Sequence, residues 1–197
     1  MASSRQRRRF FITFASLAAL GATCAAVALA ITVPDRDDVP TALDIAKTGG
    51  LHNRVADELV HTVDLFEGVN PADMLNKDKP PSSVCVEIWT RSVPGESAAD
   101  YEMCATPDAK GKAWNASIAR KRDQGPRLRL GAVKVEQPTP SRLVMRLDPD
   151  LIKRPASYVW RTETTSFGSD CSASTGCLDY APDRPGTAET KLGKPRS

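Results

Sequence analysis

The sequence is poor in the residues that most enzymes use for nucleophilic or metal-assisted catalysis. It has only two histidines, His52 and His61, among 197 residues. A serine or cysteine nucleophile needs a positioned base, and the chain contains no G-x-S-x-G elbow for such a nucleophile. It also lacks an H-E-x-x-H pair, which excludes the common zinc hydrolases. We therefore expect neither a catalytic triad nor a bound metal or other cofactor.

Helical periodicity is scarce after the N-terminal segment. From Thr41 onward, apolar and polar residues alternate with a period of two, as in residues 59–65 and 84–89. Turn residues separate about seven to eight such runs, and no internal repeat is present. The pattern predicts an all-β domain over residues 41–183, an antiparallel β-sandwich of immunoglobulin-like or jelly-roll-like type. A closed barrel is the alternative.

One of these runs changes parity in its middle. Leu128 and Leu130 share one face of the expected strand, whereas Val133 and Val135 occupy the other. A single extra residue corrects such a shift, and Gly131 is the natural place for it. We therefore expect a β-bulge and a bend near Gly131.

The N-terminal segment contains no charge over residues 10–33, a run of 24 residues that follows four arginines. This length suits a helix that spans a membrane, while Ala28-Leu29-Ala30 has the small-x-small pattern of a signal-peptidase site. We favour a cleaved signal peptide over residues 1–33, and a retained membrane anchor is the alternative. Either one places the rest of the chain outside the cytoplasm. Residues 34–40 are interpreted as a linker, and residues 184–197 as a disordered tail.

The net charge of the whole chain, +3, arises from the N-terminal segment. Its four arginines are among 27 basic residues, which leaves 23 basic against 24 acidic residues in the remainder. A balanced domain of this kind gives no reason to expect nucleic acid as a partner. Membrane contact is expected only through residues 10–33.

Four cysteines lie outside the N-terminal segment, and an even number in an oxidising compartment predicts disulfides. The midpoint between Cys85 and Cys104 falls in a Pro-Gly turn, so a hairpin folded there sets these cysteines opposite each other. The same register places apolar residues opposite apolar residues along both strands. Cys171 and Cys177 enclose five small residues and are expected to form the second disulfide.

The expected hairpin register also places Glu87 opposite Glu102. Two carboxylates about 5–5.5 Å apart are the catalytic pair of retaining glycoside hydrolases, so a small secreted hydrolase using this pair is the alternative function. On an exposed sheet face, however, opposed glutamates only repel each other slightly and point into water. We therefore expect no catalysis.

Trp89 lies on the same face as these glutamates and is the candidate binding residue. A tryptophan exposed on a β-sheet face is able to stack on a sugar ring. The other two tryptophans, Trp114 and Trp160, share parity with apolar neighbours and are expected in the core.

Aspartates gather near the two ends of the expected domain. Asp179 and Asp183, near Asp170, are candidate ligands for a structural calcium ion. Residues 34–40 contain three more aspartates but lack the glycine and glutamate of an EF-hand loop. Because aspartate is common in turns for local reasons, we interpret both groups as turn or linker residues and assign no metal site.

Three short motifs resemble parts of a known group of domains: Leu43-Asp44-Ile45, Tyr158-Val159-Trp160-Arg161, and Asp179-Tyr180-Ala181-Pro182-Asp183 after a cysteine pair. In this order they resemble uncharacterised secreted β-sandwich domains of surface proteins from high-GC bacteria. The resemblance implies an extracytoplasmic location and a β-sandwich fold, and it carries no activity. The leading functional hypothesis is a non-catalytic extracytoplasmic domain that has a binding or structural role, with a glycan or an envelope protein as its ligand.

Overall fold

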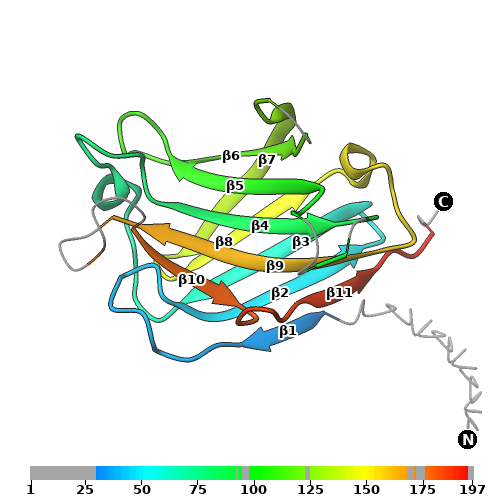
Figure 1. Cartoon of the computed structure of the whole chain (residues 1–197), viewed down its shortest axis with the longest axis horizontal. Coiled ribbons are helices and arrows are strands. Elements are labelled where there is room, and N and C mark those ends of the chain that lie inside the picture. Colours follow the sequence, from blue (N-terminus) through cyan, green and yellow to red (C-terminus); the bar gives the residue numbers. More distant parts are fainter. Residues whose placement is uncertain are drawn as a thin grey trace, which may run out of the picture.

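A computed structural model describes residues 30–91, 93–94, 98–122, 125–167, 171 and 176–194. Over these residues the protein is all-β, with eleven strands and two short 3-10 helices (Figure 1). The strands are β1 (Ile31–Pro34), β2 (Ile45–Asn53), β3 (Glu58–Leu65), β4 (Ser83–Trp89), β5 (Tyr101–Pro107), β6 (Trp114–Arg120), β7 (Leu128–Thr139), β8 (Arg142–Leu147), β9 (Ser157–Ser166), β10 (Cys177–Ala181) and β11 (Ala188–Lys191). The 3-10 helices are η1 (Pro71–Met74) and η2 (Pro149–Ile152).

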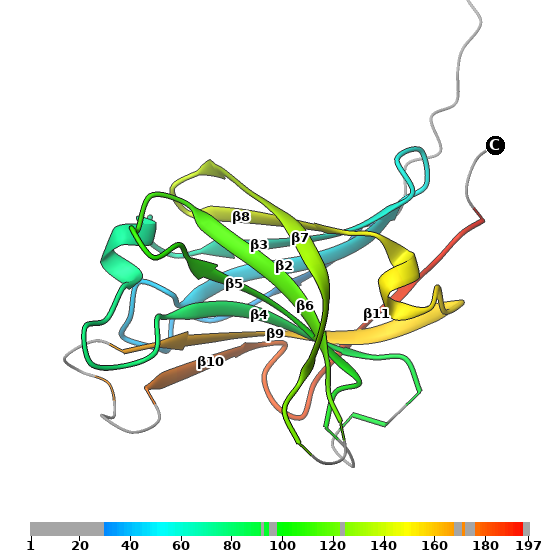
Figure 2. The same ribbon diagram turned by 90° about the horizontal axis from the view of Figure 1, so that it is seen from above.

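The strands form one antiparallel sheet in the order β1-β2-β3-β8-β7-β6-β5-β4-β9-β10. β11 also pairs with β9, along the half of its free edge that β10 leaves open. The sheet curls until β10 and β11 contact β2, which gives the molecule a nearly closed, barrel-like shape (Figures 1 and 2). We call the junction between β1–β2 and β10–β11 the seam.

The long strand β7 explains why the sheet is continuous. Its first half pairs with β6, and its second half pairs with β8. The register slips by one residue beside Gly131, between the partners of Ile118 and Ala119, so the predicted bulge is confirmed. A bulge increases local bending and twist, and here it allows a single strand to join what would otherwise be two stacked sheets.

The all-β, antiparallel prediction is therefore confirmed, whereas the sandwich of seven to eight strands is not. Eleven strands in one sheet are found over the described residues, and the closed-barrel alternative is nearer to this shape. Periodicity in the sequence identified most strands. It did not reveal that β7 belongs to both halves of the sheet, because that depends on its pairing with two neighbours that are remote from each other.

Both ends of the expected domain differ from the prediction. Residues 31–33, placed in the N-terminal segment by sequence, form β1 with Pro34 and pair with β2. Ala188–Lys191, placed in a disordered tail, forms β11. The expected N-terminal helix otherwise lies outside the described residues, among which no helix is long and apolar enough to span a membrane.

The predicted hairpin of β4 and β5 is confirmed residue by residue. Cys85 pairs with Cys104, and Glu87 pairs with Glu102. Both predicted disulfides, Cys85–Cys104 and Cys171–Cys177, are formed. The apolar residues of this hairpin face the interior of the curled sheet, where they are at most 1% exposed and pack in a single core. The disulfide Cys85–Cys104 lies on the opposite, outer face.

A small polar group lies inside the core. His61 Nε2 lies 2.8 Å from the Tyr158 hydroxyl, and the imidazole meets the Trp160 ring edge-on at 5.0 Å between centroids. Trp160 Nε1 donates a hydrogen bond of 2.9 Å to Thr190 Oγ1 on β11. Gly50 lies against the same ring, where a Cβ atom would come within 2.9 Å. These contacts secure β11 to the core and explain the ordered C-terminal strand.

Candidate functional site

Glu87 and Glu102, the candidate catalytic pair, lie side by side on the outer face of the sheet. Their side chains were expected to be in water, but the residues are only 7% and 8% exposed. Basic side chains surround both glutamates. Glu87 forms an ion pair with Arg161 on the adjacent β9, and Lys121 Nζ lies 3.6 Å from its other oxygen. Glu102 forms an ion pair with Arg127.

These ion pairs oppose the chemistry of a glycosidase. Such an enzyme keeps one carboxyl protonated as the acid and leaves the other free to act on the sugar. Here both oxygens of Glu87 face basic groups, and one oxygen of Glu102 is bound to the Arg127 guanidinium. The ion pairs instead hold the strands of the outer face together, because three basic side chains balance the charge of the two buried glutamates.

Trp89, the candidate binding residue, does not offer an exposed platform. It is 3% exposed, and the Arg161 guanidinium lies over its ring, 5.4 Å from the centroid. The same guanidinium lies 5.1 Å from the centroid of Tyr180, and Arg184 covers Tyr180 at 3.9 Å. Trp89 therefore lacks the exposure that stacking on a sugar ring would need, because an arginine of the neighbouring strand covers it. The alternating stack of rings and guanidinium groups reaches the surface at Tyr180 and Arg184.

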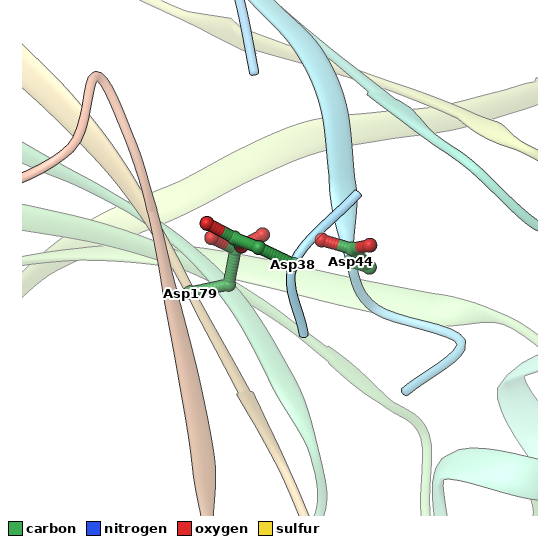
Figure 3. A group of neighbouring side chains, drawn as sticks. All are labelled: Asp38, Asp44 and Asp179. Atoms are coloured by element: carbon green, nitrogen blue, oxygen red, sulfur yellow. The ribbon is translucent and has the colours of Figure 1, made fainter. Parts of the chain in front are cut away.

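A second group of acids was not recognised in the sequence as a group. Asp38, Asp44 and Asp179 meet at the seam, and one carboxylate oxygen from each lies within 4.8 Å of the others (Figure 3). Asp38 belongs to the loop between β1 and β2, Asp44 immediately precedes β2, and Asp179 is in the middle of β10. We call these three residues the seam aspartates. Asp38 is exposed, whereas Asp44 and Asp179 are 2% and 3% exposed.

Hydrogen bonds hold Asp179 but not the Asp44 carboxylate. The Ile45 N–H donates to Asp179 Oδ2 at 2.6 Å, and the Tyr180 N–H donates to Asp179 Oδ1 at 2.6 Å. Neither carboxylate oxygen of Asp44 receives a hydrogen bond, and both are inaccessible to solvent. One oxygen of the nearby Asp35 is in the same situation.

The electrostatic consequence is that these acids resist ionisation. Burial, with added repulsion from Asp179, raises the pKa of Asp44 to about 7. Burial also raises the pKa of Asp35 to about 6, and repulsion from Asp179 and Asp183 adds to the effect. The pKa of Asp179 is raised by burial too, although its two backbone hydrogen bonds oppose the shift. The seam thus gathers carboxyl groups whose ionised forms no described basic side chain neutralises.

Sequence reasoning considered the linker aspartates and Asp179 with Asp183 separately and assigned no metal to either. The fold joins the two groups and adds Asp44, whose alternation with Leu43 and Ile45 indicated only an ordinary strand. Asp170, the third acid considered with Asp179, lies outside the described residues. Recognising the three aspartates as one group would have required knowing that β10 lies against β2. This contact joins segments more than 130 residues apart.

Comparison with known proteins identifies no relative: no family model, no curated protein and no solved structure matches the chain. Its function therefore has to be argued from its own geometry.

Proposed function

We propose that the chain is an extracytoplasmic, non-catalytic domain that binds another protein of the cell envelope. The observation that carries the location is that all four cysteines after the N-terminal segment are paired in two disulfides. Stable disulfides of this kind are typical of oxidising compartments. The engagement of Glu87 and Glu102 by basic side chains supports a binding rather than a catalytic role.

The binding surface is proposed on the outer face of β10. Leu178 is 42% exposed, Tyr180 is half-buried, and the Arg184 side chain is 56% exposed and lies over Tyr180. Tyrosine and arginine are the residues most often found at energetic hot spots of protein interfaces. Stacking on Trp89 and Arg161 beneath restricts their motion, which lowers the entropy lost on binding. Because Trp89 is covered, a protein partner is favoured over a glycan.

The N-terminal segment is proposed to be a signal peptide cleaved after Ala30. Cleavage there leaves Ile31, the first residue of β1, as the new N-terminus. In the retained-anchor alternative, a membrane helix would have to end where a paired strand begins. N-terminal sequencing of the exported protein tests the proposal: Ile31 is expected, and Met1 would establish the anchor.

A crosslinking experiment on envelope fractions tests the binding surface. Arg184→Glu should reduce recovery of the partner at least tenfold, because it reverses the charge at the centre of the surface. Lys110→Glu is the matched control, since Lys110 is also exposed but lies in the turn between β5 and β6. Equal recovery by both variants would exclude this surface. A glycan array that binds the wild type but not Arg184→Glu would replace the protein partner with a sugar.

A further inference from the structure

The seam contains buried acids without basic partners, whereas the two buried glutamates of the outer face, Glu87 and Glu102, are both paired with arginines. Over the residues that the structure describes, no lysine, arginine or histidine forms an ion pair with Asp35, Asp38, Asp44 or Asp179. A carboxylate that is removed from water without a partner loses roughly several kcal/mol of hydration free energy. Neighbouring carboxylates add repulsion to this cost. Either protons or a bound cation must therefore balance this charge.

The Asp44 side chain cannot escape to solvent by a simple rotation of its segment. Its N–H donates to the Thr41 carbonyl at 3.1 Å, and its carbonyl accepts from the Phe66 N–H at 3.1 Å. The residues on either side, Leu43 and Ile45, are 0% exposed. The backbone thus holds the carboxylate toward Asp38 and Asp179 (Figure 3).

We propose that Asp38, Asp44 and Asp179 bind a divalent cation, and that this cation is Ca²⁺. The ligand atoms are all carboxylate oxygens, which hard cations such as Ca²⁺ and Mg²⁺ prefer over transition metals. The two unpartnered oxygens of Asp44 are then ligands or acceptors for bound water.

Coordination flexibility favours Ca²⁺ over Mg²⁺. Mg²⁺ requires a nearly ideal octahedron of oxygens and keeps several waters, whereas Ca²⁺ tolerates irregular ligand sets. The seam oxygens, which all lie within 4.8 Å of one another, are compatible with the wider spacing of oxygens around Ca²⁺. Ca²⁺ also accepts irregular sets of roughly six to eight oxygens. Water molecules and nearby acids are therefore able to complete its coordination.

The site has an open approach from solvent. An open pocket of about 400 Å³ is lined by Asp37, Asp44, residues 39–42, Phe66 and Glu67. Asp37 adds further negative charge and lies next to Asp44. Solvent therefore reaches the site at the exposed Asp38 and comes close to Asp44 through this pocket, while the Asp44 carboxylate oxygens themselves are covered.

A bound cation would close the seam of the sheet. Asp38 and Asp44 lie on the segment that joins β1 to β2, and Asp179 lies on β10 at the other edge. The Ile45–Asp179 hydrogen bond crosses this junction directly, and beside it the hydroxyl of Thr48 on β2 lies 2.6 Å from that of Thr162 on β9. The cation adds a crosslink between the two edges and makes stability depend on Ca²⁺ concentration.

Thermal melting and calorimetric titration of the purified protein after EDTA treatment test the proposal. We expect Ca²⁺ to bind with a Kd of about 0.1–1 mM, as in other extracellular modules. At about ten times the Kd, the midpoint of unfolding should rise by about 3–6 °C. No heat and no shift with Ca²⁺ would overturn the proposal, and a larger shift with Mg²⁺ would overturn the choice of ion.

Two variants separate a cation site from a merely structural cluster. Asp44→Asn should lose the shift caused by Ca²⁺ yet melt no lower than the wild type in EDTA, because it removes an unbalanced buried charge. Asp38→Asn changes an exposed residue, so it should fold normally and weaken Ca²⁺ binding at least tenfold. Asp78→Asn, at an exposed residue of the loop between η1 and β4 that is not one of the seam aspartates, is the control and should keep the full response. A full response in both seam variants would also overturn the proposal.

Discussion

The outer face of β4 and β5 and the seam bury the same chemical group in opposite ways. On the outer face, Glu87 and Glu102 are surrounded by Arg161, Lys121 and Arg127. At the seam, the buried aspartates face one another, and no basic side chain among the described residues forms an ion pair with them. The buried charges of the outer face are therefore balanced within the chain itself. Those of the seam are balanced only by protons or a metal ion.

This difference separates a role in stability from a role in ligand binding. A buried acid that is fully paired contributes to the fold and has little capacity left for a ligand. A buried acid that is unpaired costs free energy in the isolated protein, and that cost is recovered when a cation binds. The sequence cannot distinguish the two cases, because both are single acids at polar positions of strands.

Removing the Arg161 guanidinium from the outer face should produce the largest loss of stability. In Arg161→Leu, Glu87 would lose its ion pair and the stack between Trp89 and Tyr180 would lose its centre. We expect a loss of about 3–5 kcal/mol in the free energy of unfolding, measured with urea. Adding Glu87→Gln should restore part of the loss, because the charge left unpaired is then removed. Additive losses in the double variant would show that the two residues are not coupled.

The disulfide Cys85–Cys104 tests whether the outer face also depends on its covalent link. Cys85→Ser and Cys104→Ser should each cost about 2–4 kcal/mol, because the unfolded chain regains the freedom of the closed loop. The double variant should cost no more than either single one. Additive losses, or thiol labelling of both cysteines in the native protein, would contradict the register of β4 and β5.

The hairpin of β4 and β5 was predictable because its information is local. A Pro-Gly turn, an apolar alternation and two cysteines at equal distances from the turn all specify one register. The basic partners of the glutamates were not predictable, since Arg161 and Arg127 come from other strands and loops. The seam was missed for the same reason: Asp38 and Asp179 look like ordinary turn residues until the sheet curls.

His61 offers a third way to bury a titratable group, with neither an ion pair nor a cation. Burial lowers the pKa of His61 to about 3, so the folded protein keeps the ring neutral. The unfolded chain binds a proton at its ordinary pKa of about 6.5, so stability is complete above pH 6.5 and falls as the pH drops toward 3. The loss from this residue is at most about 1.4 kcal/mol per pH unit.

His61→Gln should therefore flatten the pH dependence of the unfolding free energy below about pH 6.5, because glutamine does not titrate. Urea denaturation at several pH values measures this slope. Comparing the two proteins at each pH cancels the contribution of the seam acids, which titrate in the same range. A slope identical to that of the wild type would show that His61 is not kept neutral by the core.

The smallest effect is expected from a single hydrogen bond beside the seam. Thr164 Oγ1 donates to the carbonyl of Leu43, the residue before Asp44, at 2.8 Å. Thr164→Val keeps the shape but leaves a buried carbonyl unpaired, which should cost about 1–2 kcal/mol. Because it loosens the backbone at Asp44, it should also weaken Ca²⁺ binding several-fold. Unchanged affinity by calorimetry would show that this hydrogen bond does not position Asp44.

Hydrogen exchange followed by mass spectrometry compares the two regions most directly. Peptides covering residues 35–50 and 177–183 should exchange more slowly when Ca²⁺ is added, including the Ile45 amide that donates to Asp179. Peptides covering β4 and β5 should not change, because Glu87 and Glu102 already have their cations. Protection confined to the seam is the predicted result. Equal exchange of the seam peptides with and without Ca²⁺ would contradict the claim that the seam requires a cation.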